Sequence, residues 1–219
     1  MRFGPVAVED AVGALAAHTV RAGEAVVKKG RIVRAEDAAR LRAAGVASIV
    51  AVWLEPGDVG EDEAALRLAR AIAGEHCRVE RPFTGRSNLF AERAGVLVPD
   101  AARIDRINAI DEAITVATLP AYKPVVAGEM IGTVKIIPYA VPGAALDQAI
   151  AAAEGAEAAL RVAPYQRRRV AVVSTMLPGL KPSVVKKTIE VLGERLAPAE
   201  AAVVDEVRVP HAAEGLAHE

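Results

Sequence analysis

The chain has 219 residues, of which 53% are apolar and 25% charged, and its formal net charge is −1. These values describe a globular chain long enough for one large core or two small ones, and they exclude disorder as its main state. With 27 basic and 28 acidic residues, the chain carries no overall field that would attract nucleic acid or an anionic membrane, so any anion site must be local. Aromatic residues make up 3%, too few for a surface that stacks bases.

The cysteine content and the first residues of the chain allow a prediction of the cellular compartment. Cys77 is the single cysteine, so the sequence supports neither an intramolecular disulfide nor a multi-thiolate metal site, and we expect a small buried residue there. Arg2 is soon followed by Glu9 and Asp10 without an apolar signal segment, and no 18-residue uncharged apolar run occurs. We therefore expect a cytoplasmic protein that is neither exported nor membrane-spanning.

The first eighty residues predict a mixed α and β unit. Helical spacing of Val8, Val12 and Leu15 predicts a short amphipathic helix over residues 5–16. The following elements are a small antiparallel β element with turns at glycines 23 and 30, a helix from 35 that ends at glycine 45, a buried strand over 46–54, and a helix from 61 or 62 to 74.

The next stretch predicts a second mixed unit. Residues 78–95 are polar and charged, and they lead into a short strand and a helix with Ile104, Ile107 and Ile110 on one face. The later elements are three β-rich runs between 115 and 141 and an Ala-rich helix or helix pair over 143–161.

The last segment has a different pattern. After the basic connector 163–169 come an apolar run at 170–179, an amphipathic helix at 181–198 and a second apolar strand at 201–210, which is the order of a βαβ unit. We therefore predict a mixed α/β and α+β fold with three parts: an α+β N-terminal subdomain (1–80), a mixed, β-rich middle subdomain (81–165), and the opening βαβ unit of a parallel-sheet domain (166–219).

The βα junction of the last segment is the most informative candidate site. Carboxyl ends of parallel strands meet helix amino ends, so the hydroxyls of Ser174, Thr175 and Ser183 and the charge of Lys181 would converge there. A phosphate or carboxylate fits such a place. The alternative is that Ser183 only caps the helix, while Ser174 and Thr175 satisfy backbone groups at the strand end. The spacing of a P-loop is absent.

A second cluster lies in residues 84–88, too polar a stretch to be core. Arg86 offers a guanidinium fork suited to phosphate or carboxylate, and Asn88 adds an amide; the alternative is a surface turn with a salt-bridged arginine. Lys135 interrupts an apolar strand and points either into a cleft or to the solvent face.

Metal and catalytic signals are weak. The acids Asp58, Glu61, Asp62 and Glu63 could hold a hard cation, but acids at a helix start are favoured by the helix dipole in any case. The histidines at 18, 76, 211 and 218 form no zinc or triad pattern, so we assign them no role, and no residue is assigned to catalysis or to a metal. Lys28, Lys29 and the arginines at 167–169 are interpreted as solvated.

Several strings together carry a family resemblance. The more distinctive are GRSNLFA and VKIIPYAV, and they occur with GALAAHTVRAGEAVVKKGRIV, GDVGEDEAALRLARAIAG, INAIDEAITVATLPAY and VAVVSTMLPGLKPSVVKKTIEVLGERL. The chain thus resembles, over most of its length, molybdopterin-binding proteins related to the molybdopterin molybdotransferase (gephyrin-like) family. Many bacterial members of this subgroup are longer and carry a nucleotidyltransferase-like domain after the pterin-binding part.

The resemblance implies a role in molybdenum cofactor biosynthesis or handling, with molybdopterin as ligand and Mg²⁺ as a candidate ion. It implies that Ser174, Thr175, Lys181 and Ser183 hold the pterin phosphate, while Arg86 and Asn88 approach from another domain. The family's usual Thr-Gly-Asp-Glu string is replaced here by residues 175–178, Thr-Met-Leu-Pro, which removes the acids expected to help insert the metal. A later Gly-Gly-rich loop with its Asp is also missing, so the resemblance to a molybdopterin molybdotransferase extends to pterin binding more than to catalysis.

The alternative function is a noncatalytic module for oligomerisation or for docking a partner enzyme. A single βαβ unit exposes two strand edges and one sheet face and cannot bury a doubly wound core alone. The sequence therefore predicts either a fragment of a longer protein, with the nucleotidyltransferase-like domain as its partner, or pairing with another subunit in a homo-oligomer.

Overall fold

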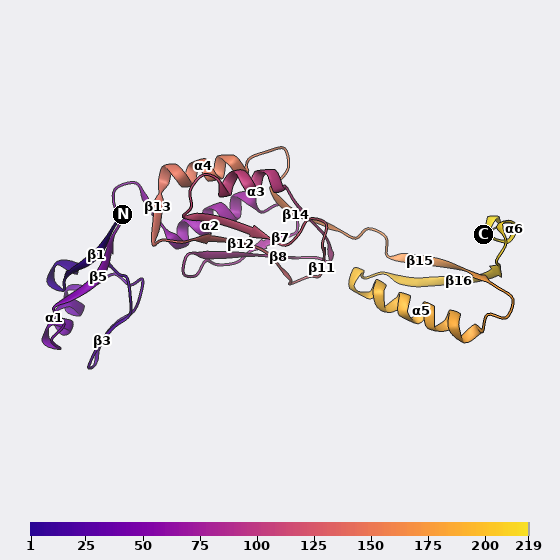
Figure 1. The fold of residues 1–219 in the computed structure, drawn as a ribbon, viewed down its shortest axis with the longest axis horizontal. Helices are drawn as coiled ribbons and strands as arrows, with labels where there is room; N and C mark the ends of the chain where they lie inside the picture. Colours follow the sequence, from indigo (N-terminus) through magenta and orange to yellow (C-terminus); the bar gives the residue numbers. More distant parts are fainter. Residues whose placement is uncertain (219) are drawn as a thin grey trace.

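The structure is a computed structural model that describes residues 1–218; residue 219, the last of the predicted third subdomain, lies outside the described residues. Three successive units follow one another along the long axis (Figure 1), which we define as the N-terminal unit (1–55), the middle unit (56–165) and the C-terminal unit (166–218). The predicted mixture of helices and strands is confirmed, and most sheets are small and antiparallel. Within residues 1–218, no helix has the length and apolar character needed to cross a lipid bilayer.

The N-terminal unit is built on an antiparallel sheet in the order β1-β5-β2, against which helix α1 (Ala35–Ala43) packs. Its other elements are β1 (Arg2–Ala7), the 3-10 turn η1 (Glu9–Ala11), β2 (Leu15–Ala16), β3 (Val20–Ala22), β4 (Ala25–Val27) and β5 (Ser48–Trp53). Gly23, Gly30 and Gly45 all have positive φ, as a chain-reversing or helix-ending position requires. The glycine-based predictions for the β3–β4 hairpin and for the end of α1 are therefore confirmed.

The predicted helix over residues 5–16 is wrong. Residues 2–7 form β1, which pairs antiparallel with β5 so that Val6 lies opposite Ile49, and only a 3-10 turn follows. A pattern that spans two helical turns is short enough to fit other structures, and Gly13 (φ +91°) takes a conformation no helix contains. Pairing with β5 satisfies the backbone of this segment and still buries Val8 and Ala11 completely.

The middle unit combines a four-stranded antiparallel sheet, in the order β10-β12-β8-β7, with a three-stranded sheet in the order β11-β9-β14. Its strands are β6 (Asp58–Gly60), β7 (Cys77–Val79), β8 (Arg86–Ala91), β9 (Gly95–Pro99), β10 (Ile114–Thr118), β11 (Pro124–Val125), β12 (Met130–Ile136), β13 (Ala140–Pro142) and β14 (Leu160–Pro164). The helices are α2 (Glu61–Ile72), α3 (Ala101–Asn108) and α4 (Gly143–Ala153). In Figure 1 they lie on one side of the four-stranded sheet.

The apolar cores divide the chain near residue 55. One cluster of buried residues runs from Val8 to Ala51, and a larger one runs from Ala64 to Val162 and includes the inner face of α2. Helix α2 therefore packs with the middle unit, whereas the sequence-based division assigned residues up to 80 to the first subdomain. The four buried positions at helical spacing that favoured α2 are the ones that contact this second core.

Two predictions for the middle unit need correction. Residues 84–88 are not a purely polar surface stretch, because Ser87 lies in β8 with no exposed surface and its hydroxyl donates to the carbonyl of Glu80 over 2.9 Å. The Ala-rich segment 143–161 is helical only to Ala153, and Leu160 already belongs to β14. Strand β14 is fixed by antiparallel pairing with the distant β9, which no local pattern reveals.

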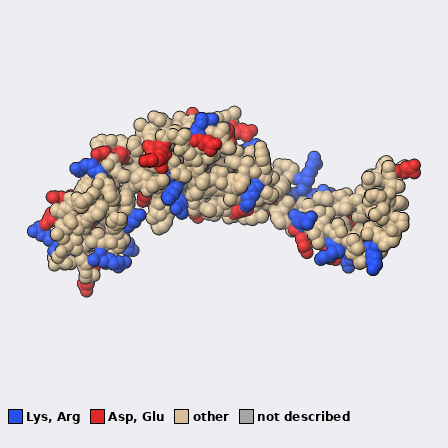
Figure 2. Space-filling view, in the orientation of Figure 1, with Lys and Arg blue, Asp and Glu red and all other residues tan. Residues whose placement is uncertain are grey.

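The C-terminal unit consists of β15 (Arg169–Met176), α5 (Pro182–Leu196), the 3-10 turn η2 (Ala197–Ala199), β16 (Ala202–Pro210) and α6 (Ala213–Ala217). β15 and β16 pair in parallel, and α5 connects them, which is the βαβ order that the sequence predicts. This sheet has two strands within the described residues, so a larger parallel-sheet domain is not established. Lys, Arg, Asp and Glu side chains are scattered over all three units on the face shown in Figure 2.

Candidate functional site

The predicted site lies at the turn between β15 and α5. Residues 177–181 join the carboxyl end of β15 to the amino end of α5, and Gly179, at φ +85°, allows the chain to reverse there. Ser174 and Thr175 lie near the carboxyl end of β15, where they pair with Arg208 and Val209 of β16. The structure therefore brings Ser174, Thr175, Lys181 and Ser183 to one end of the C-terminal unit.

The amino end of α5 begins at Lys181, which is the N-cap residue in extended conformation, followed by Pro182 in the first turn. No side chain of the described residues caps this end, so Ser183 does not act as the cap that the alternative interpretation assigned to it. Lys181 and Ser183 are both exposed, and Lys181 forms no ion pair with residues 1–218. The helix end thus presents a positive charge, a hydroxyl and the positive end of the helix dipole to solvent.

The hydroxyl of Thr175 has a partner that sequence reasoning missed. Its Oγ1 lies 2.9 Å from Nδ1 of His211, and the His211 N–H donates to the Met176 carbonyl over 3.0 Å. The residue after β16 is thereby tied to the end of β15. His211 was assigned no role because it stands 36 positions from Thr175, and only the parallel pairing of β15 with β16 brings the two together.

Ser174 lies beside an ion pair. Its Oγ is 3.4 Å from Glu206 Oε1, a weak contact, while Arg208 donates to both Glu206 oxygens over 2.7 and 3.1 Å. The hydrogen bonds from Arg208 hold the pKa of Glu206 below its usual range. Glu206 is therefore ionised and its charge is offset by Arg208, so the Ser174 side of the loop has little net charge.

Arg86 and Asn88 lie in the middle unit, on β8, and Figure 1 shows this strand in a different unit from the β15–α5 loop. Asn88 is engaged by its neighbours: its Nδ2 donates to Glu80 over 3.3 Å and its Oδ1 accepts from Thr133 over 2.9 Å. Arg86 is exposed directly opposite Lys135 on β12. The structure therefore does not bring Arg86 and Asn88 to the other four residues.

Lys135 takes the solvent side of β12. Its neighbours Val134 and Ile136 are buried while Lys135 is exposed, which is the period-2 alternation of a half-buried strand. Of the two orientations left open by the sequence, the structure has the solvent-facing one.

The comparisons with known proteins bear on the N-terminal unit. Residues 5–53 match a family model described as a domain of unknown function, DUF8806. No curated protein and no solved structure matches the chain. The matched residues include the apolar core from Val8 to Ala51.

The acidic cluster at the start of α2 is used within the protein. Asp58 accepts the Glu55 N–H over 2.8 Å and pairs with the terminal ammonium at 2.9 Å, and both the N–H and the ammonium lower its pKa. Asp62 accepts the Gly85 N–H over 2.8 Å. No group of three or more His, Cys, Asp or Glu side chains within residues 1–218 is placed to hold a metal ion. The described residues therefore offer Mg²⁺ no evident set of ligands.

The chemistry that this loop can supply is binding. An exposed ammonium, hydroxyls and a helix amino end attract a phosphate or carboxylate, and the N–H groups there donate to its oxygens. The imidazole of His211 is hydrogen-bonded to Thr175. Met176, Leu177 and Pro178 contribute no acid or base to the loop.

Proposed function

We propose that the chain binds molybdopterin, or a related pterin phosphate, through the loop between β15 and α5, as a step in molybdenum cofactor biosynthesis or handling. The observation that carries the proposal is the exposed, uncapped amino end of α5, where Lys181 and Ser183 stand beside the strand end that holds Thr175. The family resemblance of the sequence supports the choice of a pterin phosphate over other anions. We place this binding in the cytoplasm, as the single cysteine predicts.

We propose binding rather than molybdate insertion. Metal insertion in the resembled family is expected to use acids at the positions that Leu177 and Pro178 occupy here. Lys181 would neutralise the phosphate charge, while the hydroxyls of Ser183 and Thr175 would donate to its oxygens. Arg86 and Asn88 do not enter this site, because they lie in another unit and Asn88 is hydrogen-bonded there.

The test is the affinity of the full chain for molybdopterin, followed by pterin fluorescence under anaerobic conditions. Lys181→Ala removes the charge at the helix end and should weaken binding about tenfold or more, and Thr175→Ala should weaken it by a smaller factor. Lys187→Ala is the matched control, because it removes the same charge from the exposed surface of α5 away from its first turn. If wild type, Lys181→Ala and Thr175→Ala bind molybdopterin with equal affinity, the β15–α5 loop is not the binding site.

A second candidate function is docking, and it is favoured by the sheet of the C-terminal unit. Parallel sheets are ordinarily covered on both faces, yet β15 and β16 form a two-stranded sheet, and Val173 and Val204 are 37% and 50% exposed. Such a surface would accept a second copy or a nucleotidyltransferase-like domain. Size-exclusion chromatography with light scattering distinguishes the two functions: a monomer that binds pterin supports the first, and an oligomer without pterin affinity supports the second.

A further inference from the structure

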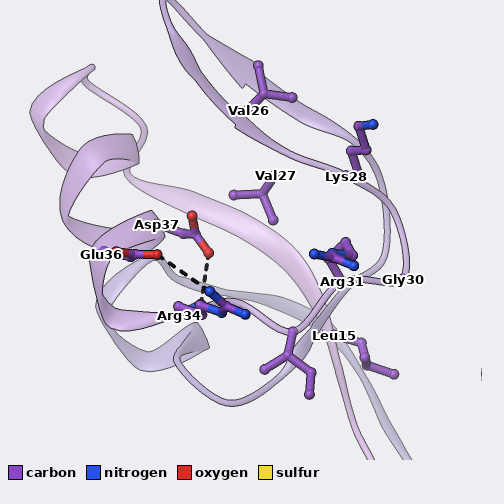
Figure 3. Close-up of a pocket in the computed structure, with 10 residues that line it drawn as sticks. Leu15, Val26, Val27, Lys28, Gly30, Arg31, Arg34, Glu36 and Asp37 are labelled. Atoms are coloured by element: carbon purple, nitrogen blue, oxygen red, sulfur yellow. Dashed lines mark hydrogen bonds and ion pairs between the residues drawn. The ribbon is translucent and has the colours of Figure 1, made fainter.

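The N-terminal unit has a concave surface that the pterin proposal does not use. It lies between the β3–β4 hairpin and the amino end of α1 (Figure 3) and has a volume of about 790 Å³. Small-molecule sites in proteins commonly have volumes of about 300–1,000 Å³. The surface falls inside the segment 5–53 that matches the domain of unknown function.

Three cationic side chains surround this concavity. Figure 3 shows the guanidinium groups of Arg31 and Arg34 directed toward the same opening, with Lys28 on the hairpin at its rim. Arg31 and Lys28 form no ion pair with residues 1–218. Neighbouring like charges raise the free energy of a site, and a bound anion would lower it.

The two acids of the concavity offset this charge only in part. Glu36 lies 3.8 Å from Nη1 of Arg34, but its other oxygen lies 3.7 Å from Arg40 on the outer surface of α1. The Asp37 carboxylate accepts the backbone N–H of Arg34 over 3.1 Å, so it already satisfies a backbone donor at the amino end of α1. The guanidinium of Arg31 is left without a counter-ion among the described residues.

The backbone that carries the arginines is held in place. The N–H of Arg31 donates to the Lys28 carbonyl over 3.1 Å, and the Arg31 carbonyl accepts the Ala16 N–H over 2.9 Å. Val33, between the two arginines, is fully buried, and its N–H donates to Ala14 over 2.8 Å. Little backbone ordering is then required when a ligand binds, which favours affinity.

Apolar side chains line the same concavity. Val27 lies beneath the opening with 4% exposure, whereas Ile32 is 59% exposed although it is a large aliphatic residue. An inorganic anion would leave this apolar surface in water, and an anion joined to an apolar group would cover it. A guanidinium prefers oxyanions that accept two parallel hydrogen bonds.

We infer that this concavity is a second binding site, for a small organic oxyanion that joins a phosphate or carboxylate to an apolar group. Arg31 and Arg34 bind the oxyanion, Lys28 adds charge at the rim, and Val27 and Ile32 contact the apolar group. The site is independent of the β15–α5 loop, because no residue is shared and the two lie in different units.

The experiment is a titration of the full chain, labelled with ¹⁵N, with phenyl phosphate, inorganic phosphate and phenol as separate probes. Phenyl phosphate should shift the backbone amides of residues 27–34 in a saturable way and bind about fivefold tighter than inorganic phosphate, because its ring covers apolar surface. Phenol, which lacks the oxyanion, should leave these amides unchanged. Arg31→Gln should weaken phenyl phosphate binding about tenfold.

Arg70→Gln is the matched control, since it removes one exposed guanidinium from α2, outside the concavity. It should leave the affinity within about twofold of wild type. Equal affinities of the Arg31→Gln and Arg70→Gln variants, or shifts that spread over other units, would overturn the inference. So would binding of octaglutamate more than tenfold tighter than phenyl phosphate, because that result would assign the surface to an acidic protein partner. Arg31→Lys, which keeps the charge but loses the fork, should give intermediate affinity.

Discussion

The hydroxyl of Tyr139 donates a hydrogen bond to the backbone carbonyl of Ala17, and this bond joins the middle unit to the N-terminal unit. Lys29, which follows β4, places its Nζ 5.4 Å from the centroid of the same ring. The backbone carbonyl of Tyr139 accepts the N–H of Glu61 over 2.9 Å, so the tyrosine is itself tied to the start of α2. One side chain thus carries two contacts across the boundary between the units.

We expect Tyr139→Phe to loosen this boundary without unfolding either unit. The substitution keeps the ring under Lys29 and removes a hydrogen bond worth about 0.5–1.5 kcal/mol. Amide exchange should accelerate at residues 54–61, and limited proteolysis there should become faster. Tyr122→Phe is the control, because Tyr122 is 74% exposed. Unchanged exchange in Tyr139→Phe would show that other contacts hold the units together.

Glu61, at the same boundary, should make stability depend on pH. Burial and the neighbouring Asp62 raise its pKa, while Lys29 lowers it less. The folded state therefore holds the Glu61 proton more tightly than the unfolded state, so stability is greatest below the unfolded pKa and is lost as pH rises through the folded pKa.

Glu61→Gln should accordingly unfold at a higher urea concentration than wild type at pH 7, and the difference should vanish near pH 4. Glu63→Gln, on the exposed part of the same helix turn, is the control. A Glu61→Gln variant that is less stable than wild type at pH 7 would show that the attraction by Lys29 outweighs the cost of burial.

Sequence patterns predicted the elements that carry long periodic signals. Helix α2 shows a buried residue at every expected position and begins at acids, and α5 has Pro182 in its first turn; both follow the prediction closely. Their local signals agree with their tertiary contacts, so no distant information was needed. The βαβ order of the last segment was predicted for the same reason.

The parts that could not be predicted depend on distant partners. β1 is a strand because it pairs with β5, more than forty residues away, and the local spacing of Val8, Val12 and Leu15 gives no sign of that pairing. His211 reaches Thr175 only through the β15–β16 pairing. Arg31 and Arg34 did not stand out in the sequence, because their common orientation depends on how residues 30–33 are hydrogen-bonded to residues 14–16.

Arg103 offers a test of packing in the middle unit. It is 9% exposed, and its guanidinium donates to Asp100 over 2.7 Å and to the carbonyls of Ala153 and Glu157 over 3.2 and 2.5 Å. Gly155 lies against it: a Cβ there would sit 2.5 Å from Nη1. The Arg103 guanidinium therefore binds the last carbonyl of α4 and a carbonyl of the turn that leads to β14.

Gly155→Ala should destabilise the protein by about 1–3 kcal/mol, because the added methyl group displaces the Arg103 guanidinium. Gly193→Ala should have the opposite sign and stabilise by up to about 1 kcal/mol, since Gly193 lies inside α5 and a Cβ there meets nothing within 4 Å. Urea unfolding of each variant and of wild type measures these two changes in the free energy of unfolding. The interpretation fails if the two substitutions change stability in the same direction.

Cys77 should be a slow nucleophile. Burial raises the pKa of its thiol to about 11, and Sγ lies 3.4 Å from the Leu160 carbonyl oxygen, to which it donates. Because the thiolate is the reactive form, the fraction of Cys77 present as thiolate near pH 8 is about a hundredfold below that of a thiol with a pKa of 9.0.

Reaction with Ellman's reagent in the folded protein should be slower than that of a free cysteine by about this factor, and its rate should rise about tenfold per pH unit toward pH 10. In 8 M urea the rate should return to that of free cysteine, because unfolding removes both the burial and the hydrogen bond. Fast reaction of the folded protein at pH 7.5 would mean that Cys77 is reached through an opening of the β7 edge rather than protected by the middle-unit core.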